Sequence, residues 1–356
     1  MLTQNTIYLS DLDSVISGQS DWSALDGRSF LIIGASGMIG TFFIDVLMRR
    51  NFKFNAKIEV FAMGRNKEHL LQRFSHYQNS PMFHFVVANV TKALPDELQT
   101  DYIINAASNT HPRAYATDPI GTITTNFFGN DQVLKHAVTH PTQRILFLSS
   151  VEVYGENRGD VTKFPENYSG YLDSNTLRAG YPESKRVSEA LCQAYIAKYH
   201  LNIVIPRLSR VFGPSMKLND SKASSQFILK AVNKENIILK SQGSQYYSYA
   251  YVADVVSALL FLLVRGKNGE AYNVANPELD IHLKDFAGEL AKVVNRKVVY
   301  NLPDATELAG YSKVTKAVLD TKKINKLGWE PLFGREASLK HTIEILRSEL
   351  EANAKD

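Results

Sequence analysis

Two segments of this chain have the residue types and spacing that redox chemistry on a hydroxyl group needs. The first is Gly34-Ala-Ser-Gly37-Met-Ile-Gly40, and the second is Tyr181-Pro-Glu-Ser-Lys185. A glycine-rich segment of this kind is typical of dinucleotide binding, and a tyrosine beside a lysine can supply a base. Either pattern alone occurs by chance. Together, in this order, they predict an oxidoreductase-type enzyme.

The context of the glycines favours dinucleotide binding over an ordinary strand-to-helix turn. They follow the apolar run 30–33 and precede a segment with apolar residues at helical spacing. Gly34 would permit the tight turn, Gly37 the approach of the backbone to a pyrophosphate, and Gly40 the packing of helix on strand. The free N–H groups of the helix start would bind the phosphates. The cofactor-binding residues expected here are Gly34, Ser36, Gly37, Met38, Ile39 and Gly40.

The form of the cofactor, NAD or NADP, stays open. NAD sites usually place an Asp or Glu at the end of the second strand, and this chain has Gly64-Arg65-Asn66 there. Arg65 could pair with a 2′-phosphate, which favours NADP. It could equally be a solvated loop charge.

Tyr181 and Lys185 are four residues apart, so on a helix they share a face. A free tyrosine titrates near ~10, and a nearby positive charge lowers that pKa. Bringing the pKa to roughly 7 requires about 4 kcal/mol, which Lys185 and a positive nicotinamide ring could provide. The tyrosinate could then remove a hydroxyl proton as hydride leaves the same carbon. A surface tyrosine beside an unrelated lysine is the alternative.

The elements that would position these residues alternate between strand and helix. Buried strands are expected at 30–33, 58–63, 84–88, 102–105, 145–148 and 203–205, and helices at 38–50, 124–138 and 184–199. This alternation predicts an α/β fold, a Rossmann-type doubly wound parallel sheet covered on both faces. After Pro206 the rhythm changes, which indicates a smaller mixed α/β C-terminal substrate lobe.

The expected organisation has three parts. Residues 1–26 form an N-terminal lead-in, and residues 27–205 with about 246–272 form the dinucleotide-binding domain. Residues 206–245 and 273–356 form the substrate-binding lobe, with a charged C-terminal helix from Ala337.

Composition excludes several classes of protein. A net charge of +4 over 356 residues, with scattered basic residues, does not favour nucleic-acid binding. The apolar run 258–264 is too short to cross a bilayer, and the polar N-terminus is no signal peptide. The single Cys192 indicates a reducing compartment, so we expect a cytoplasmic protein with no membrane partner. The nine histidines show no metal-ligand spacing, so no metal is expected. His111 is more simply a loop residue than a substrate contact.

Further motifs occur in an order that resembles the extended short-chain dehydrogenase/reductase superfamily, over residues 28–329. More narrowly, the chain is similar to the NAD(P)-dependent nucleotide-sugar epimerases, dehydratases and decarboxylases. The motifs are Asn89-Val90, Asn105-Ala-Ala-Ser108, Asn126-Phe-Phe-Gly129, Ser149-Ser-Val-Glu-Val-Tyr-Gly155, Pro206-Arg-Leu, Val211-Phe-Gly-Pro214, Tyr251-Val-Ala-Asp254 and Leu327-Gly-Trp-Glu-Pro331.

The resemblance implies a mechanism and roles for individual residues. Family members hold the nucleotide tightly, oxidise sugar C4, let chemistry occur on the ketone, and return the hydride. Ser150 would bond the reacting hydroxyl beside Tyr181, and Ser108 and Arg178 would contact substrate. The further cofactor-binding residues would be Asn89, Val90, Ala106, Ala107, Ser108, Asn126, Tyr181 and Lys185. A nucleotide-diphosphate sugar is the implied substrate, and a homodimer through helices 124–138 and 184–199 the implied assembly.

Glu152 bears on the subclass. The 4,6-dehydratases of the family often read Thr-Asp-Glu where this chain reads Ser150-Val151-Glu152, so the base is kept and that acid is missing. The segment from Arg178 to Arg186, followed by Glu189, looks most like the decarboxylases. The chemistry implied is loss of water or carbon dioxide, or epimerisation, after C4 oxidation. Glu152 could instead cap a loop.

Two positions depart from the family pattern. Relatives commonly place a phosphate-binding arginine where this chain has Tyr247, and an asparagine where it has Arg210 in an expected loop. Arg210 could supply the lost phosphate contact, or the substrate could sit differently.

Two other function classes stay open. One is an NADPH-dependent reductase of a keto-sugar or other carbonyl. The other is a non-catalytic Rossmann redox sensor, which the retained Tyr181, Lys185 and Ser150 disfavour.

Overall fold

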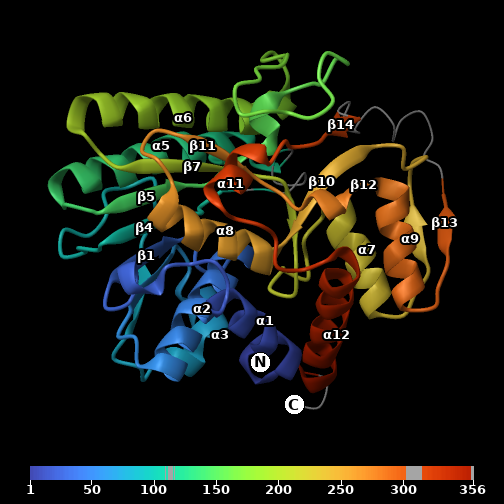
Figure 1. The fold of residues 1–356 in the computed structure, drawn as a ribbon, viewed down its shortest axis with the longest axis horizontal. Coiled ribbons are helices and arrows are strands. Elements are labelled where there is room, and N and C mark those ends of the chain that lie inside the picture. The colour runs from blue at the N-terminus through green and yellow to red at the C-terminus, as the bar shows by residue number, and fades with distance from the viewer. Residues whose placement is uncertain (109, 111–114, 116, 302–314, 354–356) are drawn as a thin grey trace.

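The computed structural model describes residues 1–108, 110, 115, 117–301 and 315–353. Its centre is an eight-stranded sheet in the order β11-β7-β5-β4-β1-β2-β3, with β6 also paired to β7 (Figure 1). Every pairing in this sheet is parallel. The strands are β1 Ser29–Ile33, β2 Glu59–Gly64, β3 Phe83–Val87, β4 Tyr102–Asn105, β5 Arg144–Phe147, β6 Ser149–Ser150, β7 Ile203–Leu208 and β11 Ala271–Val274.

The strand order reverses between β1 and β4. From β1 the chain continues to β2 and β3 on one side, and then crosses to β4, β5 and β7 on the other. In open parallel sheets, ligands bind at the carboxyl ends of the strands beside such a switch point. The expected Rossmann-type fold is confirmed, and each expected strand is present with bounds that differ by up to three residues.

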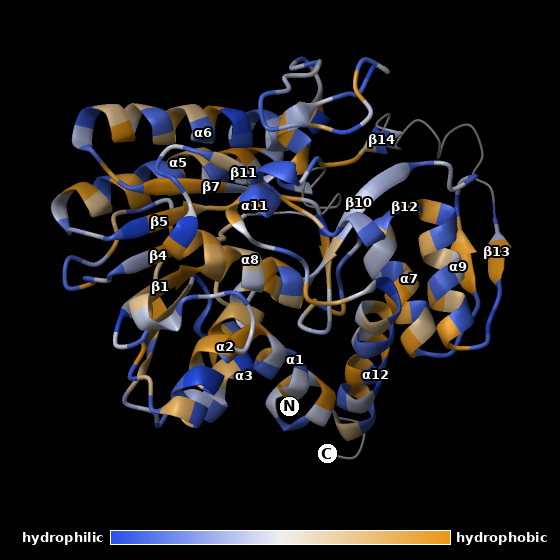
Figure 2. Ribbon diagram, in the orientation of Figure 1, coloured by the Kyte–Doolittle hydropathy of each residue, from blue (hydrophilic) through white to orange (hydrophobic). Residues whose placement is uncertain are grey.

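Helices cover both faces of the sheet. Successive side chains of a strand point to opposite faces, so a strand that is apolar throughout must be covered on both. Phe30 and Ile32 of β1 belong to the core on one face, and Leu31 and Ile33 to the core on the other. Figure 2 shows the central strands as predominantly hydrophobic. The main covering helices are α2 Met38–Phe54 and α8 Val252–Arg265 on the first face, and α5 Pro119–Thr139 and α6 Gly180–Tyr199 on the second.

The N-terminal lead-in contains a helix that the sequence patterns did not predict. Helix α1, Thr6–Ile16, packs against α2, α8 and the C-terminal helix α12, Arg335–Asn353. Two buried carboxylates hold it there. Tyr8 donates to Asp45 of α2 (2.7 Å), and Asp11 accepts hydrogen bonds from Tyr251 (2.5 Å) and His341 (2.8 Å).

Apart from α8 and β11, the region after β7 forms smaller sheets beside the central one, as expected. β10 pairs with β8, β12 and β14, and β9 pairs with β13. Helices α7, α9 and α12 pack against one another here. The bounds are β8 Arg210–Phe212, β9 Ile237–Leu239, β10 Tyr246–Tyr251, β12 Asp280–His282, β13 Val298–Tyr300, β14 Lys316–Ala317, α7 Ala223–Val232, α9 Leu283–Val293 and α11 Lys322–Leu327.

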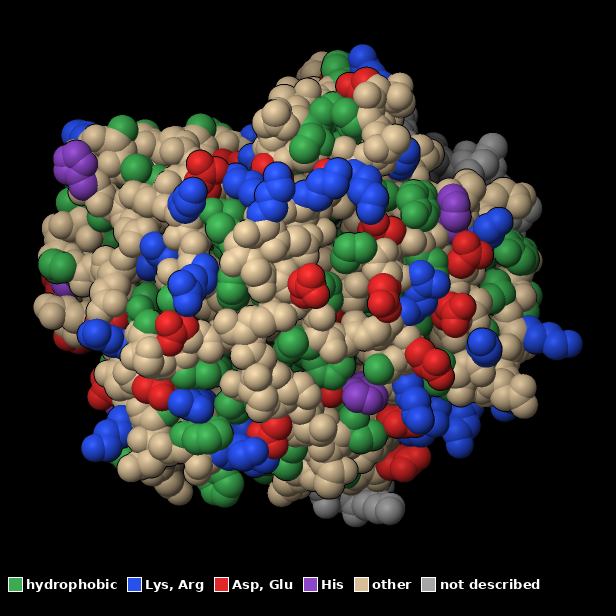
Figure 3. All heavy atoms as spheres, viewed as in Figure 1, with side chains coloured by type: hydrophobic (Ala, Val, Ile, Leu, Met, Phe, Trp, Pro, Cys, Tyr) green, Lys and Arg blue, Asp and Glu red, His purple; other side chains and the backbone are tan. Residues whose placement is uncertain are grey.

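The remaining described elements are short. They are α3 Lys67–Phe74 and the 3-10 turns Leu2–Gln4, Trp22–Ala24, Ser75–Tyr77, Val151–Tyr154, Leu177–Ala179 and Pro277–Leu279. Acidic and basic side chains are interspersed on the face in Figure 3, apart from a row of Lys and Arg across its upper part. No helix in the described part of the chain is long and apolar enough to cross a membrane.

Candidate active site

The glycine-rich segment links the carboxyl end of β1 to α2. The N–H groups of Gly34 and Ala35 both donate to the Met63 carbonyl at the end of β2 (3.1 Å each). Gly34 has φ +84°, and a Cβ on it would lie 2.9 Å from the Ala106 backbone at the end of β4. A Cβ on Gly40 would lie 2.6 Å from the Gly34 carbonyl oxygen. Glycine is therefore required at both positions, by backbone conformation and close approach at Gly34 and by space at Gly40.

The same edge of the sheet carries the other residues expected to border a cofactor. The Ala106 N–H donates to the Ile33 carbonyl (3.0 Å), so the ends of β1 and β4 lie together. Val90 follows β3 and packs beside Gly129 of α5, where a Cβ would lie 2.9 Å from it. Ser36, Gly37, Met38 and Ile39 are partly exposed at the start of α2. This cradle of small residues with free helix N–H groups fits a dinucleotide.

Helix α6 is fastened to the segment 148–150 by three side chains spaced four residues apart. Tyr181 is hydrogen-bonded to Ser150, Lys185 Nζ donates to the Leu148 carbonyl (2.7 Å), and Glu189 accepts from Ser149 Oγ (2.5 Å). Successive side chains on one helix face thus reach three consecutive residues. The sequence predicted that Tyr181 and Lys185 share a face. It singled out Glu189 only through the resemblance of this segment to the decarboxylases, without a structural role.

The electrostatics of Tyr181 differ from the expectation. Burial raises its pKa to about 12, the hydroxyls of Ser150 and Ser108 act to lower it, and Glu152 acts to raise it. Lys185 is bonded to a carbonyl and packs over the Phe147 ring, 4.8 Å from its centroid. Burial lowers the pKa of Lys185 to about 8, opposed by Glu189. The chain by itself therefore raises the pKa of Tyr181, and Lys185 is not among the groups that act on that pKa. The expected lowering of this pKa by Lys185 and a nicotinamide ring together stays a prediction.

A buried chain of hydrogen bonds positions Ser108. Its hydroxyl donates to Asn126 Oδ1 (2.7 Å), Asn126 Nδ2 donates to Ser184 Oγ (2.9 Å), and Ser184 donates to the Tyr181 carbonyl (2.8 Å). Asn126 is 2% exposed and has both ends of its amide engaged. It joins Ser108 to the start of α6, close to the Tyr181 phenol.

Glu152 lies beside this hydroxyl cluster and pairs with Arg178. Their side chains are 3.3 Å apart and both are partly exposed, and the Glu152 N–H donates to Ser150 Oγ (3.2 Å).

Tyr115 is a further residue at the site that the sequence did not predict. Its ring stacks on that of Tyr181 with centroids 5.1 Å apart, and Arg178 lies 5.9 Å from its centroid. The segment after β4 was expected near the cofactor, but nothing in the sequence distinguished Tyr115 within it.

Arg210 and Tyr247 form a second pair at the site. Arg210 is in strand β8 and not in the expected loop, and its guanidinium lies 3.5 Å from the centroid of the Tyr247 ring on β10. Burial raises the pKa of Tyr247, and the charges of Arg210, Glu152 and Arg178 all act on it. Arg210 Nη1 is buried with no hydrogen-bond partner among the described residues. The structure therefore brings Arg210 and Tyr247 close to Glu152 and Arg178.

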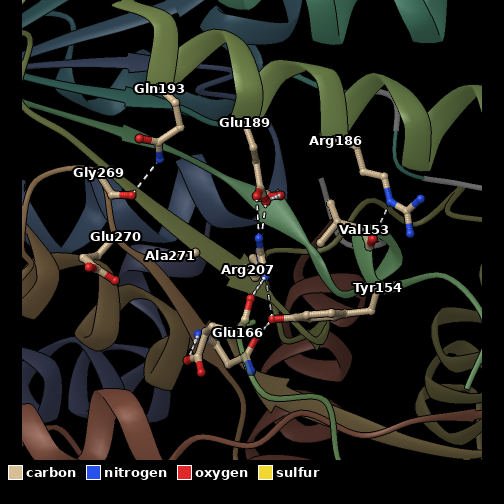
Figure 4. Close-up of polar contacts among 12 residues, drawn as sticks. Val153, Tyr154, Glu166, Arg186, Glu189, Gln193, Arg207, Gly269, Glu270 and Ala271 are labelled. Atoms are coloured by element: carbon tan, nitrogen blue, oxygen red, sulfur yellow. Dashed lines mark hydrogen bonds and ion pairs between the residues drawn. The ribbon is translucent and has the colours of Figure 1, made fainter. Parts of the chain in front are cut away.

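Glu189 also belongs to a network of polar contacts around Arg207 (Figure 4). Arg207 of β7 donates twice to Glu189 (3.0 and 2.6 Å), and also to the Tyr154 hydroxyl and the Glu166 carbonyl. Arg207, Glu189 and Glu166 border a cavity of about 580 Å³ between α6, β7 and α11. Neither Ser150 nor Tyr181 lines it, so we place the candidate active site at the carboxyl edge of the sheet.

The remaining expectations concern His111, a metal, Arg65 and Asn89. His111 lies outside the described residues. Within those residues, no cluster of three or more His, Cys, Asp or Glu side chains could hold a metal ion. Arg65 directly follows β2 and is exposed, and Asn89 Oδ1 accepts from Thr91 N (3.1 Å).

A parallel sheet with a glycine cradle at its switch point defines a dinucleotide-binding enzyme fold. The chain belongs to the NAD dependent epimerase/dehydratase family, which it matches over residues 30–275. It is 30% identical over 335 residues to UDP-glucuronic acid decarboxylase 1 of Danio rerio, covering 93% of this chain and 76% of the relative. It is 32% identical to UDP-glucuronic acid decarboxylase 6 of Arabidopsis thaliana over 308 residues, covering 85% and 83%.

Solved structures share the fold at lower sequence identity. UDP-glucuronic acid 4-epimerase from Bacillus cereus, in complex with UDP-glucuronic acid and NAD, superposes with a TM-score of 0.76 at 19% identity, covering 90% of this chain and 99% of that one. A dTDP-glucose 4,6-dehydratase from Bacillus anthracis, in complex with NAD, gives 0.74 at 20%, covering 91% and 98%. The predicted family, the NAD-type cofactor and the class of nucleotide-sugar modifying enzyme are thus confirmed, and the reductase and redox-sensor alternatives are not favoured.

Proposed function

We propose that this chain decarboxylates a UDP-glucuronate-type nucleotide sugar after oxidising its C4 position. The observation that carries the proposal is the proximity of two groups of side chains: the hydroxyls of Ser108, Ser150 and Tyr181, and the Glu152–Arg178 ion pair. The hydroxyls of the first group can hydrogen-bond a reacting sugar hydroxyl. Arg178 of the second group offers a cation for a sugar carboxylate. Relatives that are named UDP-glucuronic acid decarboxylases, matched over 76% and 83% of their own length, support this choice.

The residues that would hold the cofactor are those of the glycine cradle, 34–40, together with Ala106, Ala107 and the segment at Asn89 and Val90. Bound NAD supplies a hydride acceptor and a positively charged ring. Tyr181 and Lys185 would border its nicotinamide end. Asn126 acts one step away, by holding Ser108 in place.

In the oxidation step, Tyr181 is the proposed base. Ser150 orients the sugar 4-hydroxyl toward the phenol, and the proton leaves oxygen as hydride leaves C4. Because burial raises the pKa of Tyr181 to about 12, a positive charge must come close before the phenol ionises. Lys185, protonated below about pH 8, contributes to that charge.

Carbon dioxide is then lost from the 4-keto sugar. The C5 carboxylate is β to the new ketone, so breaking the C5–carboxyl bond leaves its electron pair on the C4 oxygen as an enolate. Ser150 and the Tyr181 hydroxyl can donate to that oxygen. C5 takes a proton, with Glu152 placed as the acid–base group, and hydride returns to C4. The cycle consumes no external oxidant or reductant.

Arg210 is the proposed ligand for a substrate phosphate. Its stacking on Tyr247 fixes the guanidinium plane and leaves one nitrogen, Nη1, without a hydrogen-bond partner among the described residues. An arginine held in this way can bind phosphate through paired donors.

The test is mass spectrometry of UDP-glucuronate incubated with the purified protein and no added cofactor. Loss of carbon dioxide mass supports decarboxylation with a recycled cofactor. A product lighter by water, or one of equal mass with altered stereochemistry, would assign dehydration or epimerisation instead. A panel with UDP-N-acetylglucosamine, GDP-mannose, dTDP-glucose and CDP-glucose controls for substrate choice. No product from any sugar would contradict the proposal.

We also propose a homodimer formed through α5 and α6, which run side by side in Figure 1. Both helices expose large apolar side chains, which contact with a second copy of the chain would bury. They are Ile120, Ile123 and Phe128 on α5 and Val187 and Tyr199 on α6. Light scattering of Ile120→Glu and Phe128→Glu tests it: monomers are expected, and an unchanged mass would contradict it.

A cytoplasmic location is part of the proposal. It rests on the single cysteine, Cys192, which is buried and free. Cell fractionation tests it, and recovery of the protein outside the cytoplasmic fraction would contradict it.

A further inference from the structure

Three basic side chains from different parts of the fold gather around the carboxyl end of β2. Arg65 directly follows that strand. The strand end itself borders the glycine cradle, since the Met63 carbonyl accepts from Gly34 and Ala35. The backbone of Arg65 therefore lies next to the position that the adenosine ribose of a dinucleotide occupies in this fold.

Arg73 and Lys217 reach the same region from elsewhere. Arg73 of α3 donates to the Ser215 carbonyl (3.4 Å), and Ser215 Oγ donates to the Met38 carbonyl at the start of α2 (2.9 Å). Lys217 lies two residues beyond Ser215 on the same segment. Burial lowers the pKa of Lys217, and the positive charges of Arg73 and Arg65 lower it further. Arg73 and Arg65 therefore both lie close enough to Lys217 for their positive charges to repel it.

Little negative charge compensates them. None of the three forms an ion pair within the described ranges. Asp220 acts on Lys217 but is itself paired with Lys222 (3.3 Å). Arg73 acts on Asp45, whose carboxylate already accepts from Tyr8 and Tyr77. A dianion placed among the three would relieve their repulsion.

We propose that Arg65, Arg73 and Lys217 form a binding site for the 2′-phosphate of NADP, so that this chain selects NADP within a family described as NAD dependent. The usual acidic residue at the end of the second strand is absent, and Asn66, which follows Arg65, uses its side-chain oxygen to accept from His69 N (2.8 Å). Arginine binds phosphate through paired, charge-assisted hydrogen bonds. NAD and NADP carry the same nicotinamide, so the proposed sugar chemistry does not depend on this inference.

The first test identifies the nucleotide that the freshly purified protein releases on denaturation, by mass spectrometry. NADP is the expected nucleotide. Calorimetric titration of nucleotide-stripped protein with NADP and with NAD then measures selectivity. NADP should bind about tenfold or more tightly than NAD, because one charge-assisted contact is worth about that factor. Its affinity should also fall more steeply with added salt.

Variants separate the 2′-phosphate from other phosphates. Arg65→Ala and Lys217→Ala should each weaken NADP about tenfold and change NAD by less than about twofold. Lys292→Ala removes an exposed charge from α9 and is the matched control.

Three results would overturn the inference. The first is release of NAD with equal affinities for the two nucleotides. The second is equal loss of NAD and NADP affinity in both variants, which would assign the cations to the shared pyrophosphate. The third is that the variants Arg65→Ala and Lys217→Ala bind UDP more weakly while their affinity for both NAD and NADP is unchanged. That result would assign the cations to the substrate site.

Discussion

The guanidinium of Arg210 stacks 3.5 Å from the centroid of the Tyr247 ring. β8 and β10 are parallel neighbours with Arg210 opposite Tyr249, so Tyr247, two residues earlier, points to the same face. The two positions where this chain departs from the family pattern are therefore one structural unit.

Arg210→Ala should raise the KM for the nucleotide sugar by about tenfold or more, with a smaller change in kcat, because a charge-assisted phosphate contact is lost. Arg210→Lys should recover part of the affinity, because it keeps the charge without the planar fork. Steady-state kinetics against UDP-glucuronate measures both. An unchanged KM in Arg210→Ala would show that the phosphates bind elsewhere.

Tyr181→Phe should strongly slow C4 oxidation and leave the fold intact, because only a hydroxyl is removed from a ring that keeps its packing on Tyr115. General acid–base catalysis is typically worth about 10²–10⁴-fold in rate, so a loss of that size is expected. Product formation measures activity, and circular dichroism controls for folding. A variant that keeps most of its turnover would refute the proposed mechanism.

Glu152→Gln should allow oxidation and slow the steps that follow, so that reduced cofactor accumulates on the enzyme. Absorbance of the bound reduced nicotinamide after addition of substrate measures this directly. Arg178→Lys is the companion variant, since it keeps a cation beside the carboxylate. Product formation by Glu152→Gln at the full rate would reduce Glu152 to a residue that only orders the turn at 151–154.

Glu189→Gln should shift the alkaline limb of the pH–rate profile to lower pH. Burial lowers the pKa of Lys185 to about 8, while Glu189 acts to raise it. The ammonium is present below that pKa and is lost above it, so removing the carboxylate moves the loss to lower pH. The other groups around Lys185 are Tyr181 and Cys192 on α6, the Phe147 ring and Leu148 carbonyl, and Arg207, whose charge would be left unpaired.

Glu183→Gln, on the same helix, is the control for this profile and should leave the limb in place. Glu189→Gln combined with Arg207→Met removes both charges of the pair and should recover part of the shift. A profile that keeps its shape in Glu189→Gln, with only a lower maximum, would limit Glu189 to packing.

Local patterns in the sequence were sufficient for the Rossmann-type sheet and for the two catalytic candidates on α6. Apolar runs such as 30–33 predict buried strands because each strand is covered on both faces, and glycines report constraints that act within a few residues. A spacing of four places Tyr181 and Lys185 on one face of any helix. The sequence patterns of the polar lead-in did not predict helix α1. Its position depends on packing against distant helices and on buried carboxylates, which local patterns do not show.

The tertiary structure decided the contacts between residues that are far apart in the chain. Asp11 accepts from Tyr251 and His341, Arg210 lies over Tyr247, and Lys217 reaches the end of β2 near Arg65. The raised pKa of Tyr181 likewise results from burial in the folded chain. Periodicity and spacing describe only neighbours along the chain. Proximity and burial, which set charge and pKa, arise when the sheet brings distant segments to one edge.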